Sequence, residues 1–185
     1  MFFPRIVRRH DYDRREDNEY YADYARYRDA IMEDCQFRCV YCDVALEECG
    51  LEGFHLDHFR PQHAFPDMRN SPFNLVLACP TCNTAKSKDW PEDELGSACY
   101  IDPFEYDRRD FFQVNEGGEI VPVREEARYS VVALKLNRLT RVHLRRRRLL
   151  GKREQELFDR ITDKIRSNIS EEEASLIRSV LSELR

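Results

Sequence analysis

Two stretches of this sequence decide its fold. They are Leu56-Asp57-His58-Phe59-Arg60-Pro61 and Asn74-Leu75-Val76-Leu77-Ala78-Cys79-Pro80-Thr81-Cys82-Asn83-Thr84-Ala85-Lys86. Residues 53–57 and 75–78 have the pattern of short strands, whereas residues 59–72 contain three prolines and should form a loop. Pro80 suits the first turn of a helix, which we expect to continue over residues 81–88. The predicted order is strand, loop, strand, helix.

Further elements are predicted on both sides of this unit. Tyr20, Tyr24, Tyr27 and Ile31 recur at helical intervals, which predicts an amphipathic packing helix over residues 12–34. After the central unit, two alternating stretches flank an Asn-Glu-Gly-Gly turn and predict a β-hairpin over residues 111–123.

The C-terminal part is predicted to be helical. The expected helices cover residues 125–150, 152–169 and 171–184, with Gly151 ending the first and a capping box of Ser170 and Glu173 starting the last. The fold class is therefore α+β. We expect residues 1–124 to form one domain and residues 125–185 to form a helical extension packed on it.

Length and composition describe a protein with a modest core. The chain has 185 residues and a mass of 22.1 kDa, with 42% hydrophobic and 35% charged residues. This composition is typical of soluble globular proteins. Neither a signal-like start nor an apolar run long enough for a membrane span occurs, so the sequence predicts a cytoplasmic protein without a membrane partner.

Positive charge is concentrated in one segment. The formal net charge is −5, yet residues 127–153 contain ten Lys or Arg and no acid, which leaves −15 on the rest of the chain. This asymmetry predicts a surface suited to a phosphate backbone, with Arg138, Arg141 and Arg145 as candidate nucleic-acid contacts. The Arg145–Arg148 run covers a full helical turn, so part of it should face solvent instead.

Four of the seven cysteines form two Cys-x-x-Cys pairs. Cys39, Cys42, Cys79 and Cys82 can supply four thiolates in a tetrahedron, the arrangement of a closed structural zinc site. The 36 residues between the pairs include the Asp-His strand and its loop. We therefore expect a zinc clamp that fixes groups otherwise carried on loops. Cys35, Cys49 and Cys99 are expected to be small buried residues or partly exposed thiols.

The cysteines also permit a different interpretation. Cys35-x3-Cys39-x2-Cys42 resembles the iron–sulfur motif of radical SAM enzymes, and Gly117-Gly118-Glu119 is similar to their glycine-rich segment. Only 143 residues follow Cys42, without the strand–helix repeats of a partial barrel, and the second cysteine pair would have no purpose.

Three polar side chains of the central unit suit phosphodiester hydrolysis. Asp57 and Asn83 offer the hard oxygen ligands that Mg²⁺ or Mn²⁺ prefers. His58 can accept a proton from water near neutral pH. Adjacent residues of a regular strand point to opposite faces, so one of Asp57 and His58 would bind the metal while the other reaches the water, with the strand's end distorted to bring both to the phosphate.

In these residues the sequence resembles the HNH endonucleases, the ββα-metal nucleases, in a form with zinc-binding cysteine pairs. The resemblance implies that His58 is the general base and that Asp57 and Asn83 bind the catalytic metal. It also implies that Asn74 holds the loop that orients His58. Asn83 stands where other members have histidine, a variant that favours hard ions.

Further residues near the central unit are candidates for contacts with the substrate. Lys86, one helical turn after Asn83, would contact phosphate. Arg60 is a candidate phosphate contact, with helix capping or an acidic partner as alternatives. His63 is a candidate contact for substrate or metal. His10, His55 and His143 are expected to be ordinary surface or core residues.

A weaker resemblance covers His58-Phe59-Arg60-Pro61, Ile101-Asp102-Pro103, the hairpin turn and residues 133–138. These segments are similar to those of HNH proteins in anti-phage defence systems, including retrons. That resemblance implies DNA as substrate and a separate ATPase or other defence-system subunit as partner. The competing functional class is a non-catalytic, zinc-stabilised module that binds nucleic acid or protein.

Overall fold

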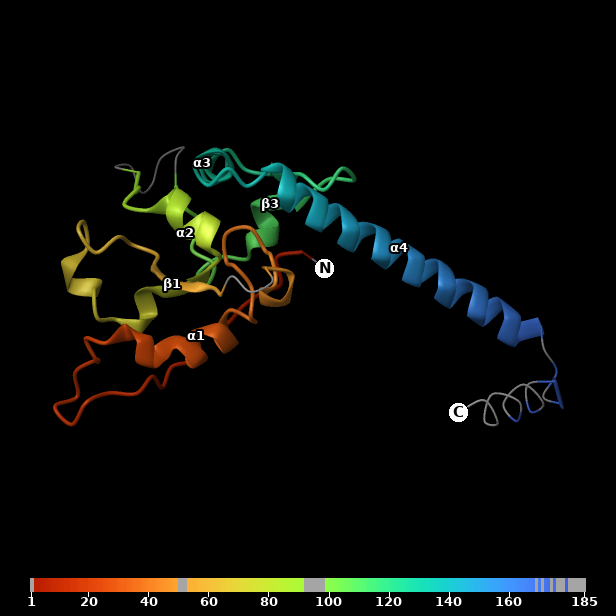
Figure 1. The fold of residues 1–185 in the computed structure, drawn as a ribbon, viewed down its shortest axis with the longest axis horizontal. Coiled ribbons are helices and arrows are strands. Elements are labelled where there is room, and N and C mark those ends of the chain that lie inside the picture. The colour runs from red at the N-terminus through yellow and green to blue at the C-terminus, as the bar shows by residue number, and fades with distance from the viewer. Residues whose placement is uncertain are drawn as a thin grey trace. The chain divides into compact units, whose positions relative to one another are not determined.

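The fold combines short helices with two small antiparallel sheets (Figure 1), which confirms the α+β class. The computed structural model describes residues 2–49, 53–91 and 99–168, together with residues 170, 172, 173, 175 and 179. The chain divides into two compact units, Met1–Arg146 and Arg147–Arg185. The first unit holds the apolar core of the described residues and both sheets.

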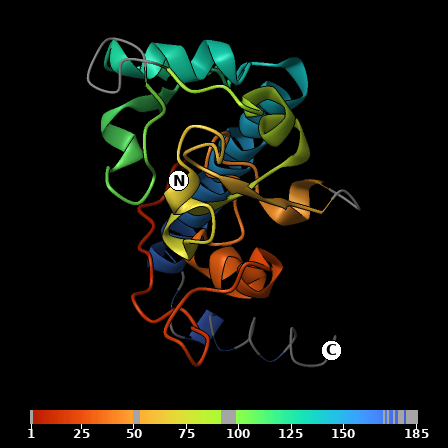
Figure 2. The same cartoon turned by 90° about the vertical axis from the view of Figure 1, so that its left-hand side faces the viewer.

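The central element is a strand pair next to a short helix. β1 (His55–His58) pairs antiparallel with β2 (Leu75–Ala78), with His55 opposite Ala78, and α2 (Pro80–Lys86) follows. Figures 1 and 2 both show α2 beside β1. Every residue of β2 is fully buried, as its apolar sequence requires. The predicted order of strand, loop, strand and helix is confirmed, with small shifts of the ends.

Short 3-10 turns fill parts of the connections. They are η1 (Tyr24–Tyr27), η2 (Leu46–Cys49), η3 (Pro66–Met68), η4 (Pro72–Asn74) and η5 (Arg108–Asp110). Two of them begin at the prolines of the loop between β1 and β2, because proline fixes the backbone angle that such a turn needs.

The prediction of one helix over residues 12–34 was wrong. Only α1 (Arg28–Asp34) is α-helical, and η1 precedes it. Asn18 has a positive φ of 66° and reverses the chain in a turn. The hydroxyl group of Tyr27 bonds to the backbone of two residues in the non-helical part. The tyrosine spacing therefore reflects aromatic packing between turns instead of one helical face.

The predicted hairpin is present as β3 (Phe112–Val114) and β4 (Ile120–Pro122). At the connecting turn, Gly118 has φ 88°, and a Cβ atom there would lie only 2.5 Å from the carbonyl oxygen of Val142. Glycine is thus required both by the backbone conformation and by the close approach of the helix that contains Val142.

The helix predicted over residues 125–150 is interrupted, and the break predicted at Gly151 does not occur. α3 (Glu126–Ala133) and α4 (Leu139–Asn168) are separated by a turn in which Lys135 has φ 47°. The side chain of Asn137 in this turn bonds to both backbone groups of Ile120, so tertiary contacts stabilise the break.

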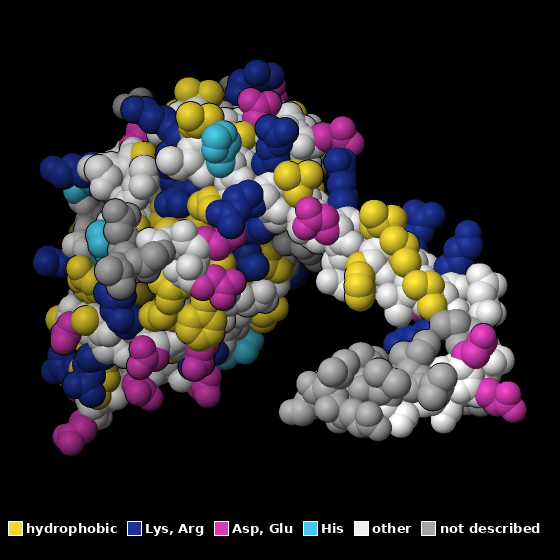
Figure 3. Space-filling model, turned by 45° about the vertical axis from the view of Figure 1, so that its right-hand side comes forward, with side chains coloured by type: hydrophobic (Ala, Val, Ile, Leu, Met, Phe, Trp, Pro, Cys, Tyr) yellow, Lys and Arg dark blue, Asp and Glu magenta, His cyan; other side chains and the backbone are white. Residues whose placement is uncertain are grey.

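The last predicted helix, residues 171–184, lies for the most part outside the described residues. Its capping box is present, because the backbone N–H of Ser170 donates to Glu173 and that of Glu173 donates to the hydroxyl of Ser170. Hydrophobic side chains lie exposed along α4 from Leu150 onward (Figure 3); they are Leu150, Leu157, Phe158, Ile161 and Ile165. None of the described helices combines the length and the apolarity that crossing a membrane requires.

Candidate metal centre and catalytic strand

The first cysteine pair lies in a tight turn. The backbone N–H of Cys39 donates to the carbonyl oxygen of Val44 at 2.9 Å, and that of Asp43 donates back to Cys39 at 2.9 Å. Asp43 has a positive φ of 62°, which closes the turn. A further backbone bond of 2.9 Å joins Val40 to Leu77 of β2. The sheet thus fixes the turn beside the second cysteine pair.

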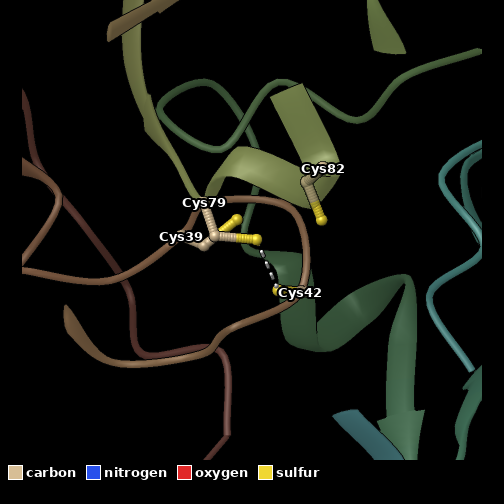
Figure 4. Close-up of side chains that lie close together, drawn as sticks. All are labelled: Cys39, Cys42, Cys79 and Cys82. Atoms are coloured by element: carbon tan, nitrogen blue, oxygen red, sulfur yellow. Dashed lines mark hydrogen bonds between the residues drawn. The ribbon is translucent and has the colours of Figure 1, made fainter. Parts of the chain in front are cut away.

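The second pair starts α2. Cys79 is the residue before the helix, Pro80 is its first residue and Cys82 lies in its first turn. Figure 4 shows the four cysteine side chains gathered from the turn and from the start of α2. Their four sulfur atoms all lie within 4.8 Å of one another, and all four side chains are buried. Four converging thiols can hold one metal ion, and this ligand set is typical of structural zinc.

Burial and hydrogen bonding shift the pKa values of the individual thiols in opposite directions. Contacts with the other three thiols lower the pKa of Cys79, whereas burial is the main cause that raises the pKa of Cys39. Cys35, the additional thiol that the iron–sulfur interpretation needs, is not in the group. Burial raises its pKa to about 12, as expected for an interior thiol. Cys49 and Cys99 are half-buried.

Arg138 contacts the sulfur cluster. Its Nη2 atom lies 3.3 Å from the sulfur of Cys82, 3.6 Å from that of Cys79 and 3.9 Å from that of Cys42. Burial lowers the pKa of Arg138, but the nearby cysteines outweigh it and raise the pKa above its ordinary value. A guanidinium at this position offsets the negative charge of four thiolates.

The other two arginines predicted to contact nucleic acid are buried. Arg141 is buried, with its Nη2 atom 3.6 Å from the sulfur of Cys49. Arg145 is buried and donates to the carbonyl oxygens of Gly118 at 2.6 Å and Leu136 at 2.9 Å. Donors of both side chains are directed at sulfur or carbonyl groups, and their contact with nucleic acid stays a prediction.

Asp57 lies on β1 and faces α2. Its Oδ2 atom accepts a hydrogen bond of 2.6 Å from the hydroxyl of Tyr41 and lies 3.5 Å from the ammonium of Lys86. Burial raises the pKa of Asp57, and the nearby Lys86 only partly offsets this. Tyr41 stands between the two cysteines of the first pair, so the metal-binding turn directly contacts the carboxylate.

Lys86 has a different position from the one expected. Its side chain is 0% exposed, and its ammonium also donates to the backbone carbonyl of His58 at 2.9 Å. Burial lowers its pKa, opposed by the attraction of Asp57. In this conformation the ammonium neutralises Asp57 and is not accessible to a phosphate group.

His58 is buried at the end of β1 and held by the loop that follows. Its Nε2 atom lies 2.8 Å from the backbone carbonyl of Arg69, and its Nδ1 atom lies 2.9 Å from the side-chain amide of Gln62. A carbonyl can only accept, so Nε2 carries the proton and Nδ1 is the basic nitrogen. The Tyr24 ring packs edge-on against the imidazole at 5.2 Å. Burial lowers the pKa of His58.

Asn74 joins the two ends of the same loop. Its side-chain oxygen accepts from the backbone N–H of Arg60 at 2.9 Å, and its amide donates to the carbonyl of Arg60 at 2.9 Å and to that of Met68 at 3.4 Å. The guanidinium of Arg60 lies 3.9 Å from the sulfur of Met68. His63 is exposed in this loop.

The side chain of Asn83 contacts His55, which the sequence predicts to be an ordinary surface or core residue. Its Nδ2 atom lies 3.1 Å from Nδ1 of His55 on β1. Tyr41, Gln62 and His55 were all missed as site residues. For His55 a signal was present, because it stands two residues before Asp57 and strand alternation places both on one face.

Comparisons with known proteins agree with this geometry. No curated protein matches the sequence. The family model for HNH endonuclease matches residues 35–89, which include both cysteine pairs, β1, β2 and α2. The resemblance inferred from the sequence is confirmed over this segment, where residues 35–89 match the HNH endonuclease model.

Proposed function

We propose that this protein is a metal-dependent endonuclease that hydrolyses phosphodiester bonds of DNA with water activated by His58. The HNH domain supports the broader assignment, a nuclease acting on nucleic acid. The observation that carries the proposal is the position of His58, which ends β1 with one ring nitrogen fixed by a backbone carbonyl and the other available as a base.

The surroundings of His58 suit a general base. The carbonyl of Arg69 fixes the tautomer and the ring orientation, as the partner of a catalytic histidine commonly does. The lowered pKa keeps the imidazole neutral at pH 7, the form that accepts a proton. The Gln62 amide now donates to Nδ1. In the proposed reaction a water molecule takes the place of this donor and passes its proton to Nδ1.

The catalytic cation would be held by Asp57 and Asn83. Both side chains make contacts across the interface between β1 and α2, and their oxygens are the ligands that Mg²⁺ or Mn²⁺ prefers. Beyond the four cysteines, the described residues contain no group of three His, Cys, Asp or Glu side chains able to hold an ion. Such an ion would neutralise charge on the phosphate, and two protein ligands plus water are common for Mg²⁺.

We also propose that the metal of the four-cysteine site is Zn²⁺ and that it has no catalytic role, because four thiolates complete a tetrahedron. Metal analysis of the purified protein should give one zinc per chain. Exposed arginines such as Arg146 and Arg147 of α4 are the remaining candidates for DNA contacts in the basic segment.

The test is cleavage of plasmid DNA in Mg²⁺ or Mn²⁺. Wild type should cut, and His58→Ala should lose activity by at least about 100-fold, the usual contribution of a positioned base. His10→Ala, at an exposed histidine outside this loop, is the matched control and should remain active. Equal activity of wild type and His58→Ala, at equal zinc content, would refute the assignment of the base.

A second function is favoured by one observation. Lys86 already neutralises Asp57, an arrangement that a non-catalytic, zinc-stabilised binding module would also show. The same assay separates the two, because the module would bind nucleic acid or a protein without cutting under any metal. The weaker resemblance to anti-phage defence proteins makes phage DNA the first substrate to test and a separate ATPase the first partner to seek.

A further inference from the structure

We propose that His55 is a positioning residue that fixes the orientation of the Asn83 side-chain amide, so that its oxygen is the end offered to the catalytic cation. This inference rests on the proposed function, in which Asn83 binds that ion. It assigns a role to a histidine that lies outside the Asp57-His58 pair.

Two side-chain contacts join β1 to α2, and each pairs one residue of the strand with one residue of the helix. Strand alternation directs His55 and Asp57 to the same face of β1. On α2, Asn83 lies against His55 at 3.1 Å and Lys86 lies against Asp57 at 3.5 Å. The amide of Asn83 is therefore held by His55, while the carboxylate of Asp57 is held by a different group one helical turn along.

The contact between Asn83 and His55 matters because the two ends of an amide differ in their chemistry. The oxygen of Asn83 can bind a cation, whereas its NH₂ group carries donor hydrogens and cannot. The two ends have nearly the same shape, so packing alone distinguishes them poorly. Since Nδ2 of Asn83 donates to the unprotonated Nδ1 of His55, the oxygen is the end turned away from the imidazole. Without an acceptor at residue 55 the amide could rotate by half a turn and direct its hydrogens at the ion.

The experiment measures metal binding directly, without DNA. Zinc-loaded protein is titrated with Mn²⁺, and free Mn²⁺ is counted by electron paramagnetic resonance. Mn²⁺ is a hard ion and does not compete for four thiolates. Asp57→Asn identifies the relevant site, because it should abolish tight binding there. His55→Ala should weaken Mn²⁺ binding by about 10-fold, the usual effect of losing a residue that orients a ligand.

Asn83→Asp provides the decisive background. A carboxylate has two equivalent oxygens and needs no orienting partner, so adding His55→Ala to Asn83→Asp should change Mn²⁺ affinity by less than about twofold. His55→Gln retains an acceptor and should keep Mn²⁺ affinity within about threefold of wild type. His10→Ala, at an exposed histidine outside the site, is the matched control, and zinc content with thermal unfolding monitors the fold.

Two results would overturn the inference while leaving the nuclease assignment intact. Equal losses from His55→Ala in both backgrounds would make His55 a direct ligand or a structural residue. No loss in either background would leave it without a role. If wild type shows no Mn²⁺ binding that Asp57→Asn abolishes, the inference fails together with the proposed cation site. Plasmid cleavage by wild type but not by His58→Ala would show whether the nuclease assignment survives.

Discussion

Replacing Lys86 with methionine is expected to destabilise the protein strongly and in a pH-dependent way. Lys86 is 0% exposed and its ammonium lies 3.5 Å from Asp57, which is itself only 8% exposed. Lys86→Met keeps most of the side-chain volume but removes the ammonium beside Asp57. The buried carboxylate then keeps its hydrogen bond from the hydroxyl of Tyr41. Removing one member of a buried ion pair typically costs about 3–5 kcal/mol.

The pH dependence follows from the carboxyl group. The variant can avoid the buried charge by protonating Asp57, whose ordinary pKa is 3.8. At about 1.36 kcal/mol per pH unit, this limits the cost from Asp57 to about 4 kcal/mol at pH 7 and about 2 kcal/mol at pH 5. The pKa of Asp57 is raised in the folded state. The variant therefore keeps its stability at low pH and loses it as the pH rises through this raised pKa. The difference from wild type should therefore grow with pH.

Urea unfolding of the zinc-loaded proteins at pH 5, 6 and 7 measures this difference. Adding Asp57→Asn to Lys86→Met removes the unpaired charge and should recover at least about 2 kcal/mol at pH 7. Lys88→Met, at an exposed position two residues further along, should change stability by less than about 0.5 kcal/mol. A small, pH-independent loss for Lys86→Met, or no recovery in the double variant, would show that the pair is not a buried ion pair.

Three further predictions concern the metal centre, the base and the basic segment. Arg138→Ala should release zinc to a chelator about 10-fold faster, since its guanidinium contacts three sulfurs, whereas exposed Arg128→Ala should not; equal rates would remove this role. The His58 imidazole, followed by nuclear magnetic resonance, should titrate below its ordinary pKa of 6.5 because burial disfavours the imidazolium, and a midpoint above 6.5 would contradict this. Arg145→Ala should cost about 3 kcal/mol of unfolding free energy because two buried carbonyls lose their donor, while Arg146→Ala should cost less than about 0.5 kcal/mol; similar losses would contradict the interior placement.

The central unit could be predicted from the sequence because local signals there agree. Prolines exclude regular structure between the two strands, and Pro80 marks the start of α2. The spacing of the cysteine pairs predicts that their sulfurs converge, and the structure confirms this. Each of these signals depends on backbone chemistry or on ligand type, so the residue types and their spacing are enough to recognise it.

The arginines could not be placed in the same way. A run of positive charge predicts a solvated or phosphate-binding surface, since an isolated charge is costly to bury. Arg138 is half-buried and Arg145 is buried because sulfurs and backbone carbonyls from segments far away in the sequence receive their donors. The break before α4 has the same origin, because Asn137 bonds to Ile120 of β4. No local pattern records these partners.

The metal centre and the proposed catalytic strand are joined by direct contacts and by α2. Tyr41, between the first two cysteines, holds the carboxylate of Asp57, and the second pair starts the helix that carries Asn83 and Lys86. A four-thiolate site contributes folding free energy only when its metal is bound. Loss of zinc should therefore release both sides of the β1–α2 interface together, so that the proposed cation ligands separate even though none of them touches zinc. The clamp would then control activity through geometry and not through chemistry.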